Sequence, residues 1–233
     1  SHMPDLMDRH APRQLIVDAG GGCGQLSASL AAAGHRVILC DISAVMLEKA
    51  RQEFKTVAPE ADVTFLHCSA QDLPVHLEQL PGSPRPNLIL FHAVIEWTVL
   101  PREALAALQS ILLPDGYLSV LFYNKHAIMW RYLMNGTFDR VLERRDEEGN
   151  LLPLPPKKYN PLLPPNPQYA EVVRAWLADL GFCVLEWSGI RSVYDHMPEK
   201  VRDRQSYDDI YAVERKWGRK EPYRDLARYV HVL

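Results

Sequence analysis

The chain has 233 residues, 47% of them hydrophobic and 24% charged, which suits one large folded domain and excludes a disordered chain. Its formal net charge of −3 argues mildly against a nucleic-acid partner. The sequence contains no run of 18 apolar residues, so no membrane span is expected. Four cysteines without a C-x-x-C pair predict reduced thiols in a cytoplasmic protein and no metal site.

The first expected elements are a strand, a glycine-rich turn and a helix. The apolar run Leu15–Asp18 ends in an acid, and Gly20, Gly22 and Gly24 follow at alternate positions before the helical pattern Gln25–Ala33. Glycines allow positive φ and a close approach of the backbone to a ligand. This order of elements therefore predicts a ligand-binding turn.

The second expected strand, Val37–Asp41, also ends in an acid. Asp41 lies 17 residues after Gly24, where a carboxylate suits the two hydroxyls of a ribose. Asp18 would repel a phosphate but can accept hydrogen bonds from a ligand's ammonium group or from ordered waters. This combination resembles the S-adenosylmethionine site of Rossmann-like methyltransferases. A nicotinamide or flavin site is an alternative, although dinucleotide folds usually have G-x-G-x-x-G, and so is a turn without a ligand.

Strands and helices continue to alternate along the chain. Further strands are expected at Val63–His67, Leu88–His92, Tyr117–Tyr123, Phe182–Val193 and Tyr229–Leu233, and further helices at Ala44–Phe54, Val75–Leu80 and Arg102–Leu112. The alternation predicts an α/β fold with a Rossmann-like, doubly wound sheet of seven strands, the short last one antiparallel. A single domain is expected over residues 1–233.

Residues 124–167 interrupt this alternation. Trp130–Val141 has a helical pattern, a charged turn follows, and Leu151–Pro167 contains seven prolines. Proline blocks helix interiors and central strands, so we expect an extended insertion on the substrate side, where long loops often form lids. A surface decoration without such a role is the alternative.

The ends of the third and fourth strands supply further candidate contacts. In a doubly wound sheet the ligand lies over the carboxyl ends of the strands. This places Ala70, Gln71 and Asp72 beside an adenine, with a helix cap as the alternative for Asp72. His92 would face the methionine arm of the ligand, and a structural histidine is the alternative. Trp97 is expected to pack in the core.

Seven segments have a more specific pattern than the glycine turn. They are Val17–Gly22, Gly34–Ser43, Phe65–Asp72, Leu88–Trp97, Leu121–Asn124, Glu221–Tyr223 and Arg228–Val232. Together they resemble the bacterial tRNA 5-carboxymethoxyuridine methyltransferases, class I enzymes dependent on S-adenosyl-L-methionine, over about residues 15–233. The family methylates the carboxylate of 5-carboxymethoxyuridine at the tRNA wobble position, giving the methyl ester. The resemblance implies that S-adenosyl-L-methionine is the cofactor. It also implies that the cofactor is contacted by Gly20, Gly21, Asp41, Ala70, Gln71 and His92.

The resemblance also implies the tRNA anticodon region as partner and a carboxylate as acceptor. An ionised carboxylate needs no general base, since its reference pKa lies near ~4, but a cation must hold it. The candidates for this cation are Arg191, Arg202, Arg204 and Arg228, with Tyr123 and Tyr194 as neighbours. Candidates for the anticodon phosphates are Lys125, Arg131, Lys157, Lys158 and Arg202. Solvated surface charge is the alternative for each, so no catalytic residue is assigned.

The charge is unevenly distributed along the chain, and on charge alone a mixed solvated surface explains this better than a substrate side in the second half. Residues 1–124 have 8 basic and 13 acidic side chains, whereas residues 191–233 have 10 basic and 8 acidic ones. Only about 14 residues precede the first expected strand, so the family's N-terminal segment, with its basic residue near the cofactor, has no counterpart to name. A methyltransferase for a small-molecule acid or phenol, and a binding protein without turnover, are the alternative functions.

Overall fold

The computed structural model describes residues 12–142 and 164–233, and its centre is a seven-stranded sheet of order β3-β2-β1-β4-β5-β7-β6. Strands β1 to β4 are parallel to their neighbours, β5 is parallel to β4, and β7 is antiparallel to both β5 and β6. The predicted α/β sheet with an antiparallel last strand is therefore confirmed. The strands are β1 (Leu15–Ala19), β2 (Arg36–Asp41), β3 (Val63–His67), β4 (Leu88–His92), β5 (Tyr117–Tyr123), β6 (Trp187–Ile190) and β7 (Tyr229–Val232).

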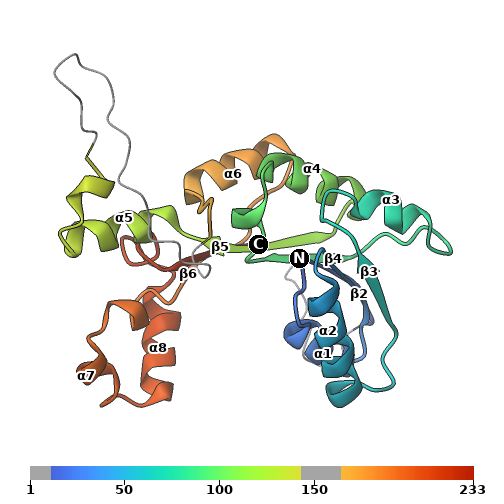
Figure 1. The fold of residues 1–233 in the computed structure, drawn as a ribbon, viewed down its shortest axis with the longest axis horizontal. Coiled ribbons are helices and arrows are strands. Elements are labelled where there is room, and N and C mark those ends of the chain that lie inside the picture. The colour runs from blue at the N-terminus through green and yellow to red at the C-terminus, as the bar shows by residue number, and fades with distance from the viewer. Residues whose placement is uncertain (1–11, 143–163) are drawn as a thin grey trace.

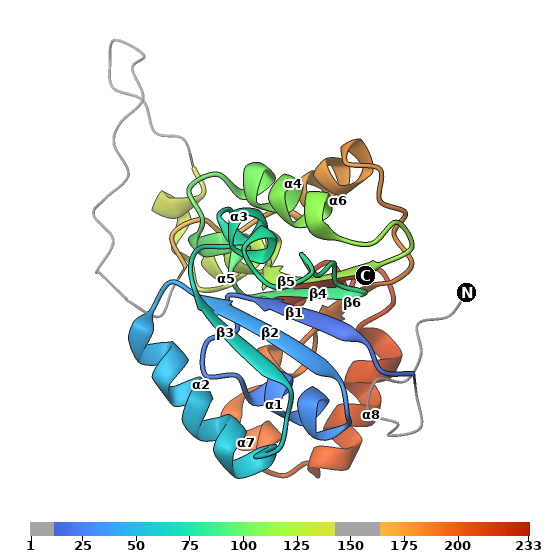
Figure 2. The same ribbon diagram turned by 90° about the vertical axis from the view of Figure 1, so that its right-hand side faces the viewer.

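Helices lie on both faces of this sheet (Figures 1 and 2). One face has α3 (Leu73–Glu78), α4 (Pro101–Ile111) and α6 (Ala170–Asp179). The other face has α1 (Gln25–Ala32) and α2 (Ala44–Val57) below the first strands, and α7 (Glu199–Arg202) and α8 (Tyr207–Trp217) towards β6. Helix α5 (Lys125–Met134) follows directly after β5. No helix in the described ranges is long and apolar enough to cross a membrane.

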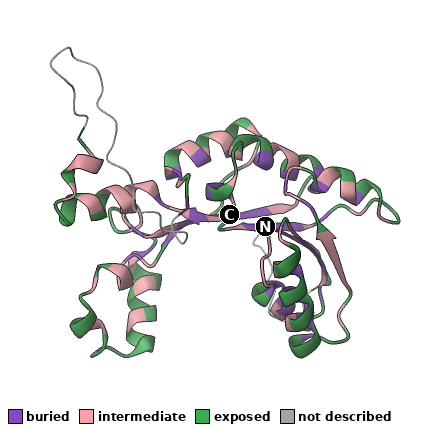
Figure 3. Ribbon diagram, in the orientation of Figure 1, coloured by how far each residue is buried: buried purple, intermediate pink, exposed green. Residues whose placement is uncertain are grey.

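The largest apolar cluster lies between the sheet and helices α3, α4 and α6. Phe91 of β4 and Phe122 of β5 are fully buried there, against Leu105 and Leu108 of α4. Buried positions follow the central strands and the inward sides of the helices (Figure 3). Strands covered on both faces become apolar along their whole length, which is why β1, β2 and β4 were readable from the sequence.

Three local predictions were wrong. The helix expected at Trp130–Val141 begins earlier, at Lys125, because the Asn124 side chain accepts a hydrogen bond from the His126 N–H and caps α5. The strand expected at Phe182–Val193 is regular only over Trp187–Ile190. Trp97 is 49% exposed and does not pack in the core. Most of the proline-rich insertion, with Lys157 and Lys158, lies outside the described residues.

Candidate functional site

The turn between β1 and α1 brings bare backbone to the carboxyl edge of the sheet. The N–H groups of Gly20 and Gly21 both donate to the Cys40 carbonyl, at 2.8 and 3.0 Å. Gly20 has a φ of +80°, and a Cβ there would lie 2.4 Å from Val94. A Cβ on Gly21 would lie 2.7 Å from a carboxylate oxygen of Asp18. Both positions therefore require glycine, because a side chain would collide with Val94 or Asp18.

Two carboxylates hold this turn. Asp18 is 6% exposed and accepts a hydrogen bond from the Ser27 hydroxyl, and burial raises the pKa of Asp18 to about 6. Asp18 thus binds the first turn of α1, and its predicted contact with a ligand ammonium group or with ordered waters stays a prediction. Asp41 accepts from the N–H of Gly22 at 2.9 Å and of Ser43 at 2.8 Å, one on each carboxylate oxygen. Each oxygen of Asp41 retains lone-pair capacity for a ligand hydroxyl.

The residues after β3 lie at the same edge as Asp41, because Asp41 pairs in register with His67. Ala70 is buried, Gln71 is partly exposed and Asp72 is exposed. Asp72 accepts a hydrogen bond from the Ser69 hydroxyl at 2.7 Å, and no side-chain cap from Asp72 to α3 is found in the described structure. This placement is compatible with the predicted adenine contacts, which stay a prediction.

His92 lies at the end of β4 in a chain of polar contacts. Its Nε2 is 2.7 Å from the Ser119 hydroxyl, which is 2.8 Å from Nε2 of His231. Burial, with a smaller effect of His231, lowers the pKa of His92 to about 4, and burial also lowers the pKa of His231. The single Ser119 proton can be donated to one ring only, so at least one of the two neutral rings is protonated at Nε2 and donates to the Ser119 oxygen. Sequence reasoning missed Ser119 and His231, because their position depends on the pairing of β5 with β7.

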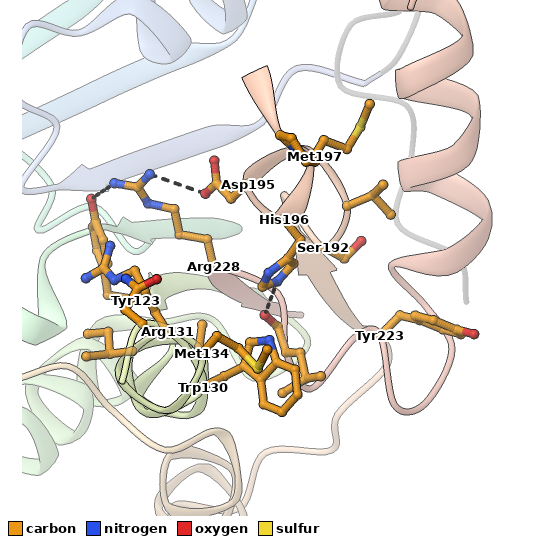
Figure 4. Close-up of a pocket in the computed structure, with 16 residues that line it drawn as sticks. Tyr123, Trp130, Arg131, Met134, Ser192, Asp195, His196, Met197, Tyr223 and Arg228 are labelled. Atoms are coloured by element: carbon orange, nitrogen blue, oxygen red, sulfur yellow. Dashed lines mark hydrogen bonds and ion pairs between the residues drawn. The ribbon is translucent and has the colours of Figure 1, made fainter. Parts of the chain in front are cut away.

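A second group of polar side chains lies at the end of β5, and we call it the arginine cluster: Tyr123, Arg191, Asp195, Arg228 and Tyr229. Arg228 donates to the Tyr123 hydroxyl and to one oxygen of Asp195, both at 3.2 Å (Figure 4). Arg191 donates to the other oxygen of Asp195 at 2.5 Å, and Tyr229 donates to the Tyr123 hydroxyl at 3.0 Å. Among the described side chains of the cluster, two guanidinium groups therefore share one carboxylate.

The arginine cluster borders a cavity of about 940 Å³ between α5 and the segment 192–198 (Figure 4). Trp130, Arg131 and Met134 line the cavity from α5, and Tyr123, Asp195 and Arg228 line it from the cluster. A cavity of this size accommodates a nucleotide-sized group. The residues of α5 thus form a wall of a candidate acceptor pocket.

The structure brings together some of the predicted cations and not others. Arg191 and Arg228 meet at Asp195, whereas Arg202 stacks on Tyr194 with its guanidinium carbon 4.7 Å from the ring centre. Arg204 is exposed and is not part of the arginine cluster. Among the predicted phosphate contacts, Arg131 lines the cavity and Lys125 lies over the Tyr169 ring at 4.6 Å.

The loop that presents Asp195 is anchored by Glu214 of α8. The Glu214 carboxylate accepts from the backbone N–H groups of Ser192, Val193 and Tyr194 at 2.8, 3.0 and 2.7 Å. Charge-assisted bonds of this kind are stronger than neutral ones. The loop is therefore held in one conformation, although no motif in the sequence singled out Glu214.

Glu96, in the 3-10 turn Ile95–Trp97, lies behind Tyr123. It is fully buried, and one of its oxygens accepts from the Tyr123 N–H at 3.4 Å. Its other oxygen, Oε2, has no partner among the described residues, and burial raises the pKa of Glu96 to about 7. Sequence reasoning passed over Glu96, because nothing in its neighbours indicated complete burial.

Comparisons with known proteins agree with this geometry. A model of the methyltransferase domain matches residues 16–116. A tRNA 5-carboxymethoxyuridine methyltransferase of Escherichia coli K12 is 39% identical over 222 residues, 95% of this chain and 80% of that protein. A demethylmenaquinone methyltransferase of Clavibacter sepedonicus is 33% identical over 101 residues, 43% of this chain and 38% of that protein. The solved magnesium protoporphyrin IX methyltransferase of Synechocystis PCC 6803 with bound SAH has a TM-score of 0.55 at 22% identity, covering 78% of this chain and 68% of that one.

The sheet order, the glycine turn after β1 and the acid ending β2 define, with these matches, a class I S-adenosylmethionine-dependent methyltransferase. The similarity to the structure from Synechocystis extends to the fold alone. Within the class, the chain belongs to the family of the tRNA 5-carboxymethoxyuridine methyltransferases, because its identity to the E. coli member extends over nearly the whole chain. The family resemblance seen in the sequence is thereby confirmed.

Proposed function

We propose that the chain methylates the carboxylate of 5-carboxymethoxyuridine at the wobble position of tRNA and gives the methyl ester. The observation that carries this proposal is the 39% identity, over 95% of the chain, to a relative named for this nucleoside. The arginine cluster supports the proposal, because a carboxylate acceptor needs a cation to hold it. The proposed location is the cytoplasm and the proposed partner is the anticodon region of tRNA.

The residues at the carboxyl edge of β1 to β4 fit S-adenosylmethionine. Gly20 and Gly21 let the turn pack tightly against Val94 and Asp18, and Asp41 has acceptor capacity for ribose hydroxyls. Ala70 and Gln71 would lie beside the adenine, and His92 would face the methionine arm. When bound, the cofactor would supply an activated methyl group on a positively charged sulfur, which would pass to a carboxylate oxygen with S-adenosylhomocysteine as the leaving group.

The chain's own task in this reaction is to bind, orient and exclude water. The acceptor carboxylate is ionised at pH 7, since its reference pKa lies near ~4, so no residue has to remove a proton. Alignment of two reactants in a site without water supplies on the order of 7–11 kcal/mol. The acceptor would lie in the cavity beside α5, which Tyr123 lines from the end of β5, the strand paired with β4.

The test uses tRNA that has 5-carboxymethoxyuridine at the wobble position. The tRNA is incubated with the protein and methyl-labelled cofactor, and its nucleosides are analysed by mass spectrometry. We expect the wobble nucleoside to gain one methyl group, and dilute alkali to release the label as methanol, because esters hydrolyse where N-methyl, C-methyl and ordinary ether groups persist. Label that stays on the nucleoside in alkali contradicts a carboxylate acceptor.

A methyltransferase for a small-molecule acid or phenol is the second candidate. The match to the demethylmenaquinone methyltransferase favours it only in part, because that match covers 101 residues, 43% of the chain. The family model likewise ends at residue 116, before the cavity residues of α5. Transfer to a small acid or phenol without transfer to tRNA would favour this second candidate over the first.

A further inference from the structure

We propose, on the basis of the proposed function, that Arg228 and Tyr123 bind the acceptor carboxylate. In the absence of the acceptor, the carboxylate of Asp195 takes its place as the ion-pair partner of Arg228. Asp195 pairs with Arg228 before the tRNA binds and pairs with it again after the carboxylate has become an ester. Arg228 and Tyr123 therefore determine the specificity of the site for a charged acceptor, and Asp195 positions Arg228.

The first argument is the balance of charge in the arginine cluster. Asp195 accepts from Arg191 on Oδ1 and from Arg228 on Oδ2, so its single negative charge is divided between two guanidinium groups. A guanidinium has five N–H donors, and the described bonds of Arg228 use two of them. The Arg228 side chain is 33% exposed and lines the cavity, so it can accept a second anion from that side.

The second argument is the direction of the Tyr123 hydroxyl. Its oxygen accepts from Arg228 at 3.2 Å and from the Tyr229 hydroxyl at 3.0 Å. Both of these bonds point towards Tyr123, so its own proton is available to donate to a third group. A carboxylate in the cavity can thus receive an N–H from Arg228 and an O–H from Tyr123.

The third argument is the position of Tyr123 on the sheet relative to the proposed cofactor site. Leu121 of β5 pairs in register with His92 of β4, and Tyr123 lies two residues beyond Leu121. Residues two apart on a strand share a face. Tyr123 therefore lies on the side of β5 from which Ser119 contacts His92, at the carboxyl edge where the methyl donor is expected.

The fourth argument is that this anion site is already built before a substrate arrives. Glu214 fixes the backbone of residues 192–194, and Arg191 has a φ of +61°, a left-handed conformation that non-glycine residues rarely adopt. The Asp195 carboxylate compensates the arginines and keeps them in place. A substrate carboxylate exchanges for Asp195 as one ion pair for another, and the neutral ester cannot make this exchange.

The test compares two tRNAs that differ only in the wobble nucleoside, which is the carboxylic acid in one and its methyl ester in the other. Their dissociation constants are measured by fluorescence anisotropy at one salt concentration, without the methyl donor. We expect the wild-type protein to bind the acid at least about tenfold more tightly than the ester, because charged hydrogen bonds distinguish the two. In Arg228→Gln the ratio of the two constants should fall to about one.

The ratio is read within one variant, so a general loss of stability or of phosphate contacts cancels. Arg204→Gln, at an exposed arginine outside the cluster, is the matched control and should keep the wild-type ratio. Tyr123→Phe removes only the hydroxyl and should lower the ratio by severalfold, which keeps the proposal testable if Arg228→Gln does not fold. A wild-type ratio in Tyr123→Phe and in folded Arg228→Gln would overturn the carboxylate contact.

Asp195→Asn tests whether the Asp195 carboxylate competes with the acceptor carboxylate for Arg228. The asparagine keeps the size of the side chain but removes the competing charge, so the acid should bind several times more tightly than to the wild type while the ester is unaffected. An unchanged or lower ratio would overturn this role of Asp195. Failure of the proposed function is seen separately, as a wild-type protein that transfers no methyl group to the acid tRNA.

Discussion

At the scale of single residues, Asp41 is the side chain whose charge is expected to matter most for binding of the cofactor. It accepts one backbone N–H on each oxygen and has acceptor capacity left for the ribose. Asp41→Asn should weaken S-adenosylmethionine binding by about 1.5–3 kcal/mol, the usual loss for hydrogen bonds to a charged group. Titration calorimetry measures this, with Asp115→Asn at an exposed turn as control. Equal affinity in folded Asp41→Asn and wild type would remove the ribose assignment.

Glu96 provides a prediction about pH. Its pKa is raised from 4.5 to about 7, so between these values the native protein holds a proton that the unfolded chain has lost. The free energy of unfolding therefore declines as pH rises through this window. Glu96→Gln removes the effect. The free energy of unfolding of the variant, relative to that of the wild type, should therefore be higher at pH 8 than at pH 4.5 by up to about 3 kcal/mol. Urea unfolding at both pH values measures the gain, and a difference between the two proteins that is independent of pH would contradict it.

The residues that sequence reasoning found and missed differ in one physical respect. Asp41 and His92 end apolar strands and Ala70 lies shortly after another, and the carboxyl ends of parallel strands meet at one edge, so their placement at this edge was predictable, while their contacts with the cofactor stay a prediction. Glu96 and Glu214 act through burial and through backbone N–H groups supplied by distant segments. Neither property leaves a pattern in the neighbouring residues.

At the scale of elements, the central strands and the boundary of α5 show the same contrast. Strands β1 to β5 were predicted to within two residues, because continuous apolar runs indicate strands that are covered on both faces. The start of α5 depends instead on Asn124. Its side chain caps the helix and also donates to the carbonyls of Asp225 and Ala227, about one hundred residues away.

This dependence makes Asn124 the residue that joins α5 to the segment before β7. It is fully buried, and its amide donates to those two carbonyls at 2.8 and 2.9 Å. Asn124→Asp keeps the cap acceptor but removes both donors, so the free energy of unfolding should fall by about 2–5 kcal/mol. Urea unfolding measures the loss. Asn135→Asp, exposed at the other end of α5, should cost at most about 1 kcal/mol, and a similar loss in both variants would contradict the role of Asn124.

At the scale of the whole molecule, binding of tRNA has to overcome a formal net charge of −3. Acidic side chains exceed basic ones in residues 1–124, which include β1 to β5, whereas the second half supplies Arg131 and Arg228, which line the cavity, and Arg191, which pairs with Asp195. We therefore expect local positive charge to supply the attraction for phosphates, while the net charge opposes unspecific binding. The uneven distribution of charge was visible in the sequence, but the pairing of Arg191 and Arg228 through Asp195 required the fold.

The affinity for tRNA should consequently fall steeply with salt, because each phosphate contact releases counterions and contributes about −0.7 to −0.9 to the slope of log K against log salt concentration. Lys157 and Lys158, which lie outside the described residues, are predicted to make two such contacts. Replacing both with alanine should make the slope shallower by about 1.5, as measured by anisotropy over a salt series. Lys49→Ala with Lys55→Ala, on exposed positions of α2, is the matched control and should keep the wild-type slope. A slope near zero in the wild-type protein would contradict a tRNA partner and favour the small-molecule acceptor. An unchanged slope in the variant of Lys157 and Lys158 would instead assign the phosphate contacts to other cations, such as Arg131.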